Sequence, residues 1–146
     1  GAFADDVGLS WNRIDDVCIV IKSAPTRVSQ GCGDLPKEMS QTEMEEKGVT
    51  EHGVTTGRAR RKSLEIPFEL LKDVFMINSP TYIALTFCDH VDSVKEALPF
   101  SGSKDFLKDK LPKTYENINK LEKMFGVPVR YVEYGKTMRD VYKVEG

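Results

Sequence analysis

The sequence has 146 residues and a mass of 16.4 kDa, a length that predicts one domain (residues 1–146) with room for a substantial core. Its 21 Lys and Arg residues nearly balance 23 Asp and Glu residues, which argues against a nucleic-acid-binding protein because such proteins are usually strongly basic. Apolar residues make up 40% and charged residues 30%, which is typical of a globular domain. No apolar run approaches the roughly 20 residues of a membrane span, and no signal peptide opens the sequence. We therefore expect no membrane and no nucleic-acid partner.

The cysteines and histidines are too scattered for a zinc site. Cys18, Cys32 and Cys88 are an odd number without metal-like pairing, and His52 and His90 lack companion ligands. This usage is typical of a reduced, cytoplasmic protein. It predicts no metal site of the chain's own.

Three apolar segments predict β-strands: residues 17–21, 82–88 and 127–134. The first is a continuous, mostly β-branched run, which is typical of a strand buried on both faces. A long polar and Gly-rich stretch then reaches Gly57, and loops of this length are usually functional or disordered.

Helix signals lie between and after these strands. Ser40-Gln41-Thr42-Glu43 is a capping-box pattern that predicts a short helix to about Lys47, closed by Gly48. Apolar spacing predicts helices over residues 67–78 and 112–125, the second ending at Gly126.

The remaining segments give weaker signals. We expect a short helix over residues 92–98, a surface loop over residues 100–110, and a short helix or a strand over residues 138–144.

Strands that alternate with helices predict an α/β fold with a mostly parallel sheet and crossover helices. Such sheets bind ligands at the carboxyl ends of their strands. Functional residues are therefore expected after Lys22, Cys88 and Tyr134.

The densest chemical feature is the run Gly53-Val54-Thr55-Thr56-Gly57-Arg58-Ala59-Arg60-Arg61. Glycine permits a tight turn, threonine hydroxyls donate hydrogen bonds, and arginine binds carboxylates or phosphates in a bidentate manner. These residue types suit a small dianion. A solvated basic turn or a nuclear-type basic patch would have the same composition.

Weaker candidates follow the strands. Asp89 comes directly after a predicted strand, where its carboxylate could accept two N–H groups from a guanine edge or cap the following turn. The segments 26–28 and 133–136 are equally compatible with ligand contacts or plain turns. Cys88 reads as a buried structural cysteine rather than as a nucleophile.

Together these motifs resemble the carboxy-terminal half of the adenylosuccinate synthetase family. The resemblance rests on residues 4–9 and 14–17, Thr26-Arg27-Val28, the Thr55-Thr56-Gly57-Arg58 loop, Leu85-Thr86-Phe87-Cys88-Asp89 and Gly126-Val127-Pro128-Val129, in the family's order and spacing. Only the loop motif is specific by itself. The short 100–110 region suggests the compact, archaeal-like branch.

The resemblance implies a P-loop NTPase-like ligase fold and a two-step reaction that uses GTP and Mg²⁺ to join L-aspartate to IMP, giving adenylosuccinate, GDP and phosphate. It implies that L-aspartate and IMP contact Val28, Val54, Thr55, Thr56, Gly57, Arg58 and Arg60. It implies that GTP contacts Arg60, Phe87, Cys88, Asp89, Tyr134 and Gly135. A homodimer is typical of the family.

The sequence also departs from the family. The phosphate loop and the catalytic aspartate and histidine belong to an amino-terminal half that is absent here, so the resemblance assigns no catalytic residue and no Mg²⁺ ligand to this chain, which alone is expected to be inactive. Phe87-Cys88 replaces Lys-Leu, and Glu133-Tyr134-Gly135-Lys136 replaces Ser-Thr-Gly-Pro. Two alternatives stay open: an ATP-using, phage-type relative acting on dGMP, and a non-catalytic nucleotide-binding fragment.

Overall fold

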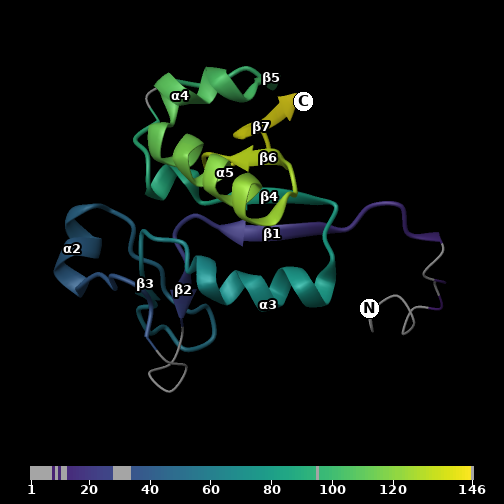
Figure 1. Cartoon of the computed structure of the whole chain (residues 1–146). Helices are drawn as coiled ribbons and strands as arrows, with labels where there is room; N and C mark the ends of the chain where they lie inside the picture. The colour runs from purple at the N-terminus through teal and green to yellow at the C-terminus, as the bar shows by residue number, and fades with distance from the viewer. Residues whose placement is uncertain (1–7, 9, 11–12, 28–33, 95, 146) are drawn as a thin grey trace.

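The computed structural model describes residues 8, 10, 13–27, 34–94 and 96–145. A five-stranded sheet forms its centre (Figure 1). In spatial order its strands are β1 (Cys18–Lys22), β4 (Tyr82–Thr86), β6 (Val129–Glu133), β7 (Val141–Glu145) and β5 (Ser101–Ser103). Strands β1, β4 and β6 are parallel, β7 is antiparallel to β6, and β5 is parallel to β7. The predicted mostly parallel α/β sheet is confirmed.

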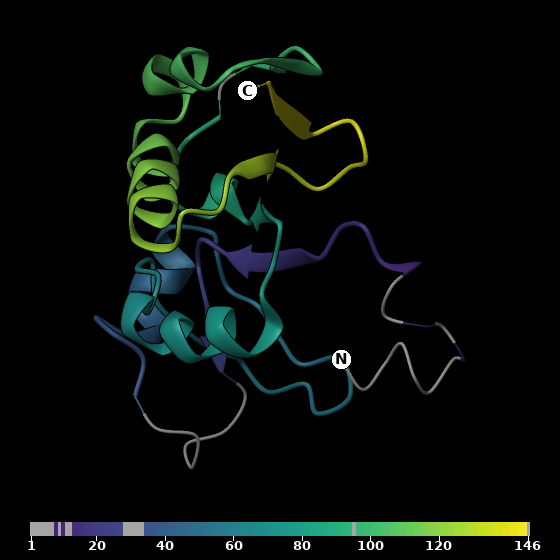
Figure 2. The ribbon, with the colours of Figure 1, turned by 45° about the vertical axis from the view of Figure 1, so that its right-hand side comes forward.

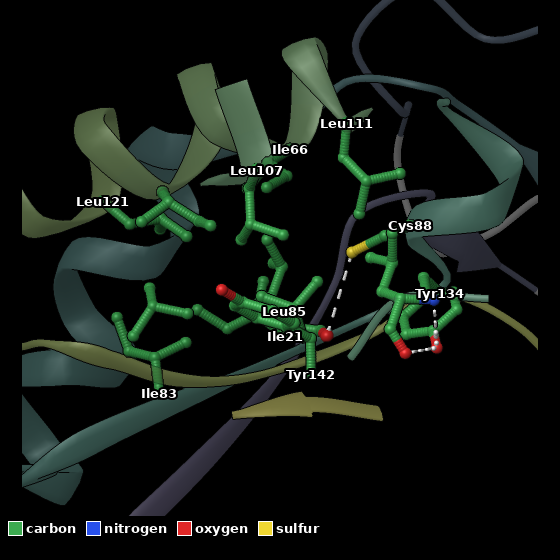
Figure 3. Close-up of a cluster of buried hydrophobic side chains, with 14 of the residues drawn as sticks. Ile21, Ile66, Ile83, Leu85, Cys88, Leu107, Leu111, Leu121, Tyr134 and Tyr142 are labelled. Atoms are coloured by element: carbon green, nitrogen blue, oxygen red, sulfur yellow. Dashed lines mark hydrogen bonds between the residues drawn. The ribbon is translucent and has the colours of Figure 1, made fainter. Parts of the chain in front are cut away.

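Two helices cover one face of this sheet. Helix α3 (Phe68–Asn78) leads into β4 and helix α5 (Pro112–Phe125) leads into β6, so each lies within a connection between parallel strands (Figures 1 and 2). The rings of Phe75 and Phe125 stack at a centroid distance of 3.9 Å and join the two helices. The core between helices and sheet is fully buried at Ile83, Leu85, Ile118, Leu121 and Val132 (Figure 3 shows Ile83, Leu85 and Leu121 in this cluster).

The prediction that the first strand is buried on both faces is wrong. Strand β1 is at the sheet edge and pairs only with β4 among the described residues. Ile21 faces the helices and is buried, whereas Val20 on the other face is 65% exposed and Cys18 is also exposed. The β-branched run reflects strand propensity, while burial depends on what packs against each face.

The strongest local signals are confirmed. Helix α2 (Gln41–Glu46) begins with the predicted capping box, in which Ser40 and Glu43 exchange side-chain and backbone hydrogen bonds. Helix α5 ends at Gly126 in the left-handed conformation, at a φ of 67°. Residues 138–144 overlap β7, which begins at Val141 and ends at Glu145, so the strand alternative of the two that the sequence left open is confirmed.

Two weaker predictions are wrong. The described residues of 92–98 contain no helix. There Asp92 instead accepts hydrogen bonds from the N–H and the hydroxyl of Thr114, both at 2.8 Å, at the start of α5. The expected surface loop over residues 100–110 contains β5, the 3-10 turn η4 (Lys104–Phe106) and helix α4 (Leu107–Lys110), and it buries Leu107 completely.

A second, two-stranded sheet forms within the long polar region and just after it. Strand β2 (Thr26–Arg27) pairs antiparallel with β3 (Arg61–Lys62). This pairing brings the chain that follows the Gly53–Arg61 motif back to the carboxyl end of β1. Within the described part of the chain, no helix is long and apolar enough to cross a membrane.

Candidate functional site

The Gly53–Arg61 motif forms a compact, hairpin-like loop, here called the arginine loop (residues 53–61). Its base is closed by a bridge between His52 and Ala59 and by an Arg60 N–H that donates to the Glu51 carbonyl at 2.8 Å. Its tip is closed by a Gly57 N–H that donates to the Gly53 carbonyl at 2.8 Å. Backbone hydrogen bonds thus close the loop, and two side chains support it: the Thr56 hydroxyl accepts from the Arg58 N–H at 3.4 Å, and the Arg61 Nε donates to the Glu38 carboxylate at 2.6 Å.

The two glycines of the loop are required by its geometry. Gly57 has a φ of 64°, in the left-handed region that favours glycine. A Cβ on Gly53 would lie 2.9 Å from the Thr56 hydroxyl. Since the backbone turns tightly at both positions, the remaining side chains point outward: Val54, Thr55, Thr56 and Arg58 are all exposed. The hydroxyls and the Arg58 guanidinium are therefore accessible to a ligand.

Polar groups at the base of the loop lack hydrogen-bond partners. The buried Nε of Arg60 and the buried Oγ1 of Thr50 have none among the residues that the structure describes. Buried polar groups are usually hydrogen-bonded, so each such group calls for an explanation. A ligand that brings its own acceptors and donors would satisfy both.

A pocket of about 380 Å³ opens beside these two residues, at the carboxyl edge of β4 and β6. It contains three of the residues that the sequence predicts for the base of a nucleotide: Phe87, Asp89 and Gly135. The lining is completed by Gly48, Val49, Thr50, Glu51, His90, Glu133 and Lys136. The segment 48–51 precedes the arginine loop by one residue, and the Arg60 N–H binds the Glu51 carbonyl, so the base of the loop is attached to the pocket wall although no loop residue lines the pocket.

Phe87 connects β4 to the 3-10 turn η3 (Cys88–His90) in an unusual backbone conformation. Its φ of 58° lies in the left-handed region, which is uncommon for an aromatic residue. Its N–H donates to the Glu133 carboxylate at 2.8 Å, and the Lys22 Nζ lies 4.0 Å from the centre of its ring. Strained backbone held by such contacts is typical of ligand sites. The consequence is a sharp turn that places Asp89 in the pocket wall.

Glu133 is the second carboxylate in this wall, and the sequence left its segment undecided between ligand contact and turn. Burial raises its pKa, and the hydrogen bond from the Phe87 N–H works in the opposite direction. Its nearest charged neighbours include Asp89, which also raises that pKa. The pocket lining thus has two carboxylates that the fold uses internally, Glu51 and Glu133, and a third, Asp89, that has no hydrogen bond from a backbone N–H among the described residues.

Two other predicted residues, Cys88 and Tyr134, are turned into the core. Figure 3 shows Cys88 within the buried cluster, and its side chain is fully excluded from solvent. Its Sγ lies 3.3 Å from the Ser23 hydroxyl, and burial raises the pKa of this thiol to about 12. The Tyr134 hydroxyl turns into the core and accepts a hydrogen bond from the Leu98 N–H at 3.1 Å (Figure 3). Because both side chains are turned into the core, Cys88 and Tyr134 can contact a ligand only through backbone groups. Val28 lies outside the described residues.

The fold and the pocket define an α/β protein with a charged ligand site at the carboxyl edge of a mostly parallel sheet, which is where such folds bind nucleotides. The family model for adenylosuccinate synthetase matches residues 1–126. The chain belongs to the adenylosuccinate synthetase family.

Individual relatives agree with this membership. The chain is 41% identical over 141 residues to the adenylosuccinate synthetase of Thermococcus sibiricus, a match covering 96% of this chain and 39% of that protein. It is 41% identical over 137 residues to the Methanocaldococcus jannaschii adenylosuccinate synthetase, covering 94% of this chain and 37% of the relative. The chain therefore spans about two fifths of the length of these curated relatives, and it matches their carboxy-terminal part.

Solved structures share the fold. Fully ligated adenylosuccinate synthetase from Plasmodium falciparum superposes with a TM-score of 0.71 at 24% identity, covering 97% of this chain and 43% of that one. The cyanophage S-2L succinoaminodeoxyadenylate synthetase, bound to dGMP and dATP, gives a TM-score of 0.68 at 19% identity, covering 99% and 38%.

Proposed function

We propose that this chain is the substrate-binding part of an adenylosuccinate synthetase: together with a part that carries the phosphate loop, it ligates L-aspartate to IMP at the expense of GTP. The observation that carries the proposal is that Glu51 lines the pocket with Phe87 and Asp89 and also accepts, through its carbonyl, a hydrogen bond from the Arg60 N–H at the base of the arginine loop. One element suits a dianionic amino acid, and the other suits a nucleobase. Their adjacency suits a reaction that consumes both ligands.

In the arginine loop, Thr55, Thr56 and Arg58 would bind the two carboxylates of L-aspartate. Their exposure leaves hydroxyl and guanidinium donors available, and arginine–carboxylate hydrogen bonds are among the strongest in proteins. The loop would orient the amino group for attack on C6 of the activated IMP, from which phosphate then departs. Arg60, whose Nε is buried and unpartnered among the described residues, would approach the nucleotide phosphates and offset the charge that develops during transfer.

In the pocket, Asp89 would accept two hydrogen bonds from the guanine edge, and the backbone at Gly135 would lie against the base. Phe87 and the backbone of Cys88 and Tyr134 would complete this subsite. The described residues contain no group of three His, Cys, Asp or Glu side chains able to hold a metal ion. In this proposal, Mg²⁺ arrives with the nucleotide and is held by the part of the enzyme that carries the phosphate loop.

The exposed edge of β1 supports the need for a second part. Its outer backbone groups pair with no strand in the described part of the chain, and the apolar Val20 is exposed beside it. An open, apolar strand edge is an aggregation hazard unless another segment covers it. The amino-terminal part of the enzyme would add its sheet here, and the isolated chain would be inactive. A cytoplasmic homodimer is part of the same proposal.

The test is a fusion enzyme, defined as the amino-terminal part of the Methanocaldococcus jannaschii relative that this chain does not match, joined to residues 1–146. With GTP and IMP, phosphate release that requires L-aspartate, together with formation of adenylosuccinate, is the expected result. A well-folded fusion that releases no phosphate in response to L-aspartate would overturn the proposal. If the active fusion sediments as a monomer, only the homodimer part of the proposal is wrong.

The phage-type reaction is the second candidate, favoured by Phe87-Cys88 and by the shared fold of the cyanophage protein. The same fusion compares GTP and IMP with ATP and dGMP. A strong preference for GTP and IMP removes the phage-type reading. Turnover with ATP and dGMP alone would replace the leading proposal with it. Ligand binding by the isolated, folded chain without any turnover by the fusion would favour the non-catalytic fragment.

A further inference from the structure

A fully buried lysine lies between the arginine loop and the pocket. The Lys62 side chain is completely excluded from solvent, and its Nζ lies 3.0 Å from the Glu51 Oε2 and 2.8 Å from the His90 Nδ1. Lysine is almost never fully buried unless its charge is paired. This ammonium has a carboxylate on one side and an imidazole on the other, and neither lies on its own strand.

Glu51 is shared between two lysines. Its other oxygen lies 3.4 Å from the Lys22 Nζ at the end of β1, and Lys22 in turn covers the Phe87 ring. Burial opposes ionisation of Glu51, but Lys62 and Lys22 outweigh it and lower the pKa of this carboxyl. Glu51 is thus a carboxylate that links β1, β3 and the segment before the loop.

His90 accepts rather than donates in this cluster. Burial lowers its pKa, and Lys62 and Lys22 lower it further, while Asp89 and Glu51 act in the opposite direction. Because an ammonium has only donors, the Nδ1 facing Lys62 must be the acceptor, which puts the proton of the neutral ring on Nε2. The ring also meets Phe87 edge-on at a centroid distance of 5.0 Å.

The three residues come from the two elements that the proposed function requires. Glu51 precedes the arginine loop and Lys62 follows it, so they hold both of its ends. His90 follows Asp89 directly in η3 and lines the same pocket. A buried ion pair of this kind adds little net stability relative to apolar packing, and its best-attested use is to fix one arrangement of the parts that it joins.

We propose that Glu51, Lys62 and His90 form a positioning network. This network fixes the arginine loop relative to the pocket around Phe87 and Asp89, here called the base pocket. None of the three needs to contact a reacting atom. The inference rests on the proposed function, because it takes the loop and the pocket as the subsites for L-aspartate and GTP. Loss of the network leaves both subsites present but wrongly placed with respect to each other.

The kinetic test uses Lys62→Met in the fusion enzyme. The expected result is a rise of about tenfold in the KM for both L-aspartate and GTP, with kcat changed less than threefold. Lys72→Met is the matched control, since Lys72 makes an ordinary exposed ion pair with Glu69 on α3, and both KM values should stay unchanged. A fall in kcat with both KM values unchanged would indicate only a loss of folded enzyme and would overturn the inference.

A double variant addresses misfolding. In Lys62→Met the Glu51 carboxylate loses its nearest partner, which is costly for a half-buried charge. Glu51→Gln combined with Lys62→Met removes both charges and should restore the thermal midpoint while keeping both KM values raised. Normal KM values in a stable double variant would show that the network has no positioning role.

Nuclear magnetic resonance of the 146-residue chain separates this inference from the proposed function. The chain has only two histidines, and His52 is exposed, so its imidazole is an internal reference. Lys62→Met should raise the pKa of His90, release its fixed Nε2–H tautomer, and shift amide signals in both the arginine loop and the pocket. Shifts confined to β3 would overturn the network even if the ligase is active. Should the wild-type fusion lack ligase activity, these signals would still decide whether the network exists.

Discussion

The arginine loop and the base pocket are joined through the segment 48–51, yet the fold prepares them to different degrees. In the pocket, Phe87 is held by a carboxylate, a lysine and an imidazole, so the wall exists before any ligand arrives. In the loop the backbone is fixed, but the side chains at its tip are exposed: Arg58 and both threonines. Side chains that are free before binding lose rotamer freedom on binding, which weakens the affinity for the ligand that they hold.

This difference predicts which substitutions should impair activity alone and which should lower both activity and stability. A change in an exposed loop side chain removes a ligand contact without touching the core, so it should impair activity alone. A change in the pocket wall alters groups that also hold the fold together, so it should affect both. The predictions below test this separation.

Arg58→Ala should give the largest effect. Loss of one or two charge-assisted contacts to L-aspartate costs on the order of 2–4 kcal/mol of transition-state stabilisation, a fall of about 30- to 1000-fold in kcat/KM for L-aspartate in the fusion enzyme. The urea midpoint should stay unchanged because the side chain is exposed. Steady-state kinetics and urea unfolding of the same preparation check both statements, and unaltered aspartate kinetics would remove Arg58 from the site.

Asp89→Asn should have the next largest effect. The amide keeps one acceptor oxygen but loses the charge, so hydrogen bonds to a guanine edge worth about 1.5–3 kcal/mol are weakened. The KM for GTP should rise about tenfold to a hundredfold, and the preference for GTP over ATP should shrink. Asp73→Asn on the exposed surface of α3 is the control. Equal losses with GTP and ATP would show that Asp89 does not read the base.

Local signals explain why much of the fold was predictable. A capping box, a terminal glycine and apolar spacing located α2, α3 and α5. The rule that parallel strands end at one edge of the sheet placed Asp89 and Gly135 at that edge, the family resemblance added Phe87, and the structure has all three in one pocket. The helix signals lie within a few residues of the features that they specify, and the topological rule needs only the order of strands and helices.

The features that were missed depend on distant partners. Asp92 caps α5 through Thr114, 22 residues away, so residues 92–98 do not form the expected helix. Tyr134 turns inward to bond with Leu98, 36 residues away. Likewise, Lys62 reads as one more charge in a basic run, and only the β2–β3 pairing buries it beside Glu51 and His90.

Gly57→Ala tests whether the loop backbone matters as much as its side chains. An alanine at a φ of 64° meets no neighbouring atom but is strained by about 1–2 kcal/mol in the left-handed region. The tip of the loop should relax, and the KM for L-aspartate should rise about tenfold, whereas the KM for GTP, which depends on Arg60 at the base of the loop and on the pocket, should rise less than threefold. Gly126→Ala, with the same kind of strain at the end of α5, is the matched control and should lower the thermal midpoint without altering either KM. An equal rise in both KM values with Gly57→Ala would mean that loop and pocket do not separate.

The smallest expected effect is on the pH dependence of stability, which involves His90 and Glu133 in the pocket lining. His90 has a pKa below its ordinary value of about 6.5 in the folded chain, because of burial and of Lys62. As the pH falls from 7.5 toward 5.5, the unfolded chain takes up this proton first, so stability falls, by less than the ~1.4 kcal/mol per pH unit that one whole proton would give. Glu133, whose pKa is raised, acts with the opposite sign, since its contribution is present at low pH and is lost as the pH rises. His90→Asn should therefore reduce the fall in the urea midpoint between pH 7.5 and 5.5, whereas the exposed His52→Asn should leave it as it is. An unchanged slope in His90→Asn would mean that the imidazole is not held neutral against Lys62, and the pocket would then be no better prepared than the loop.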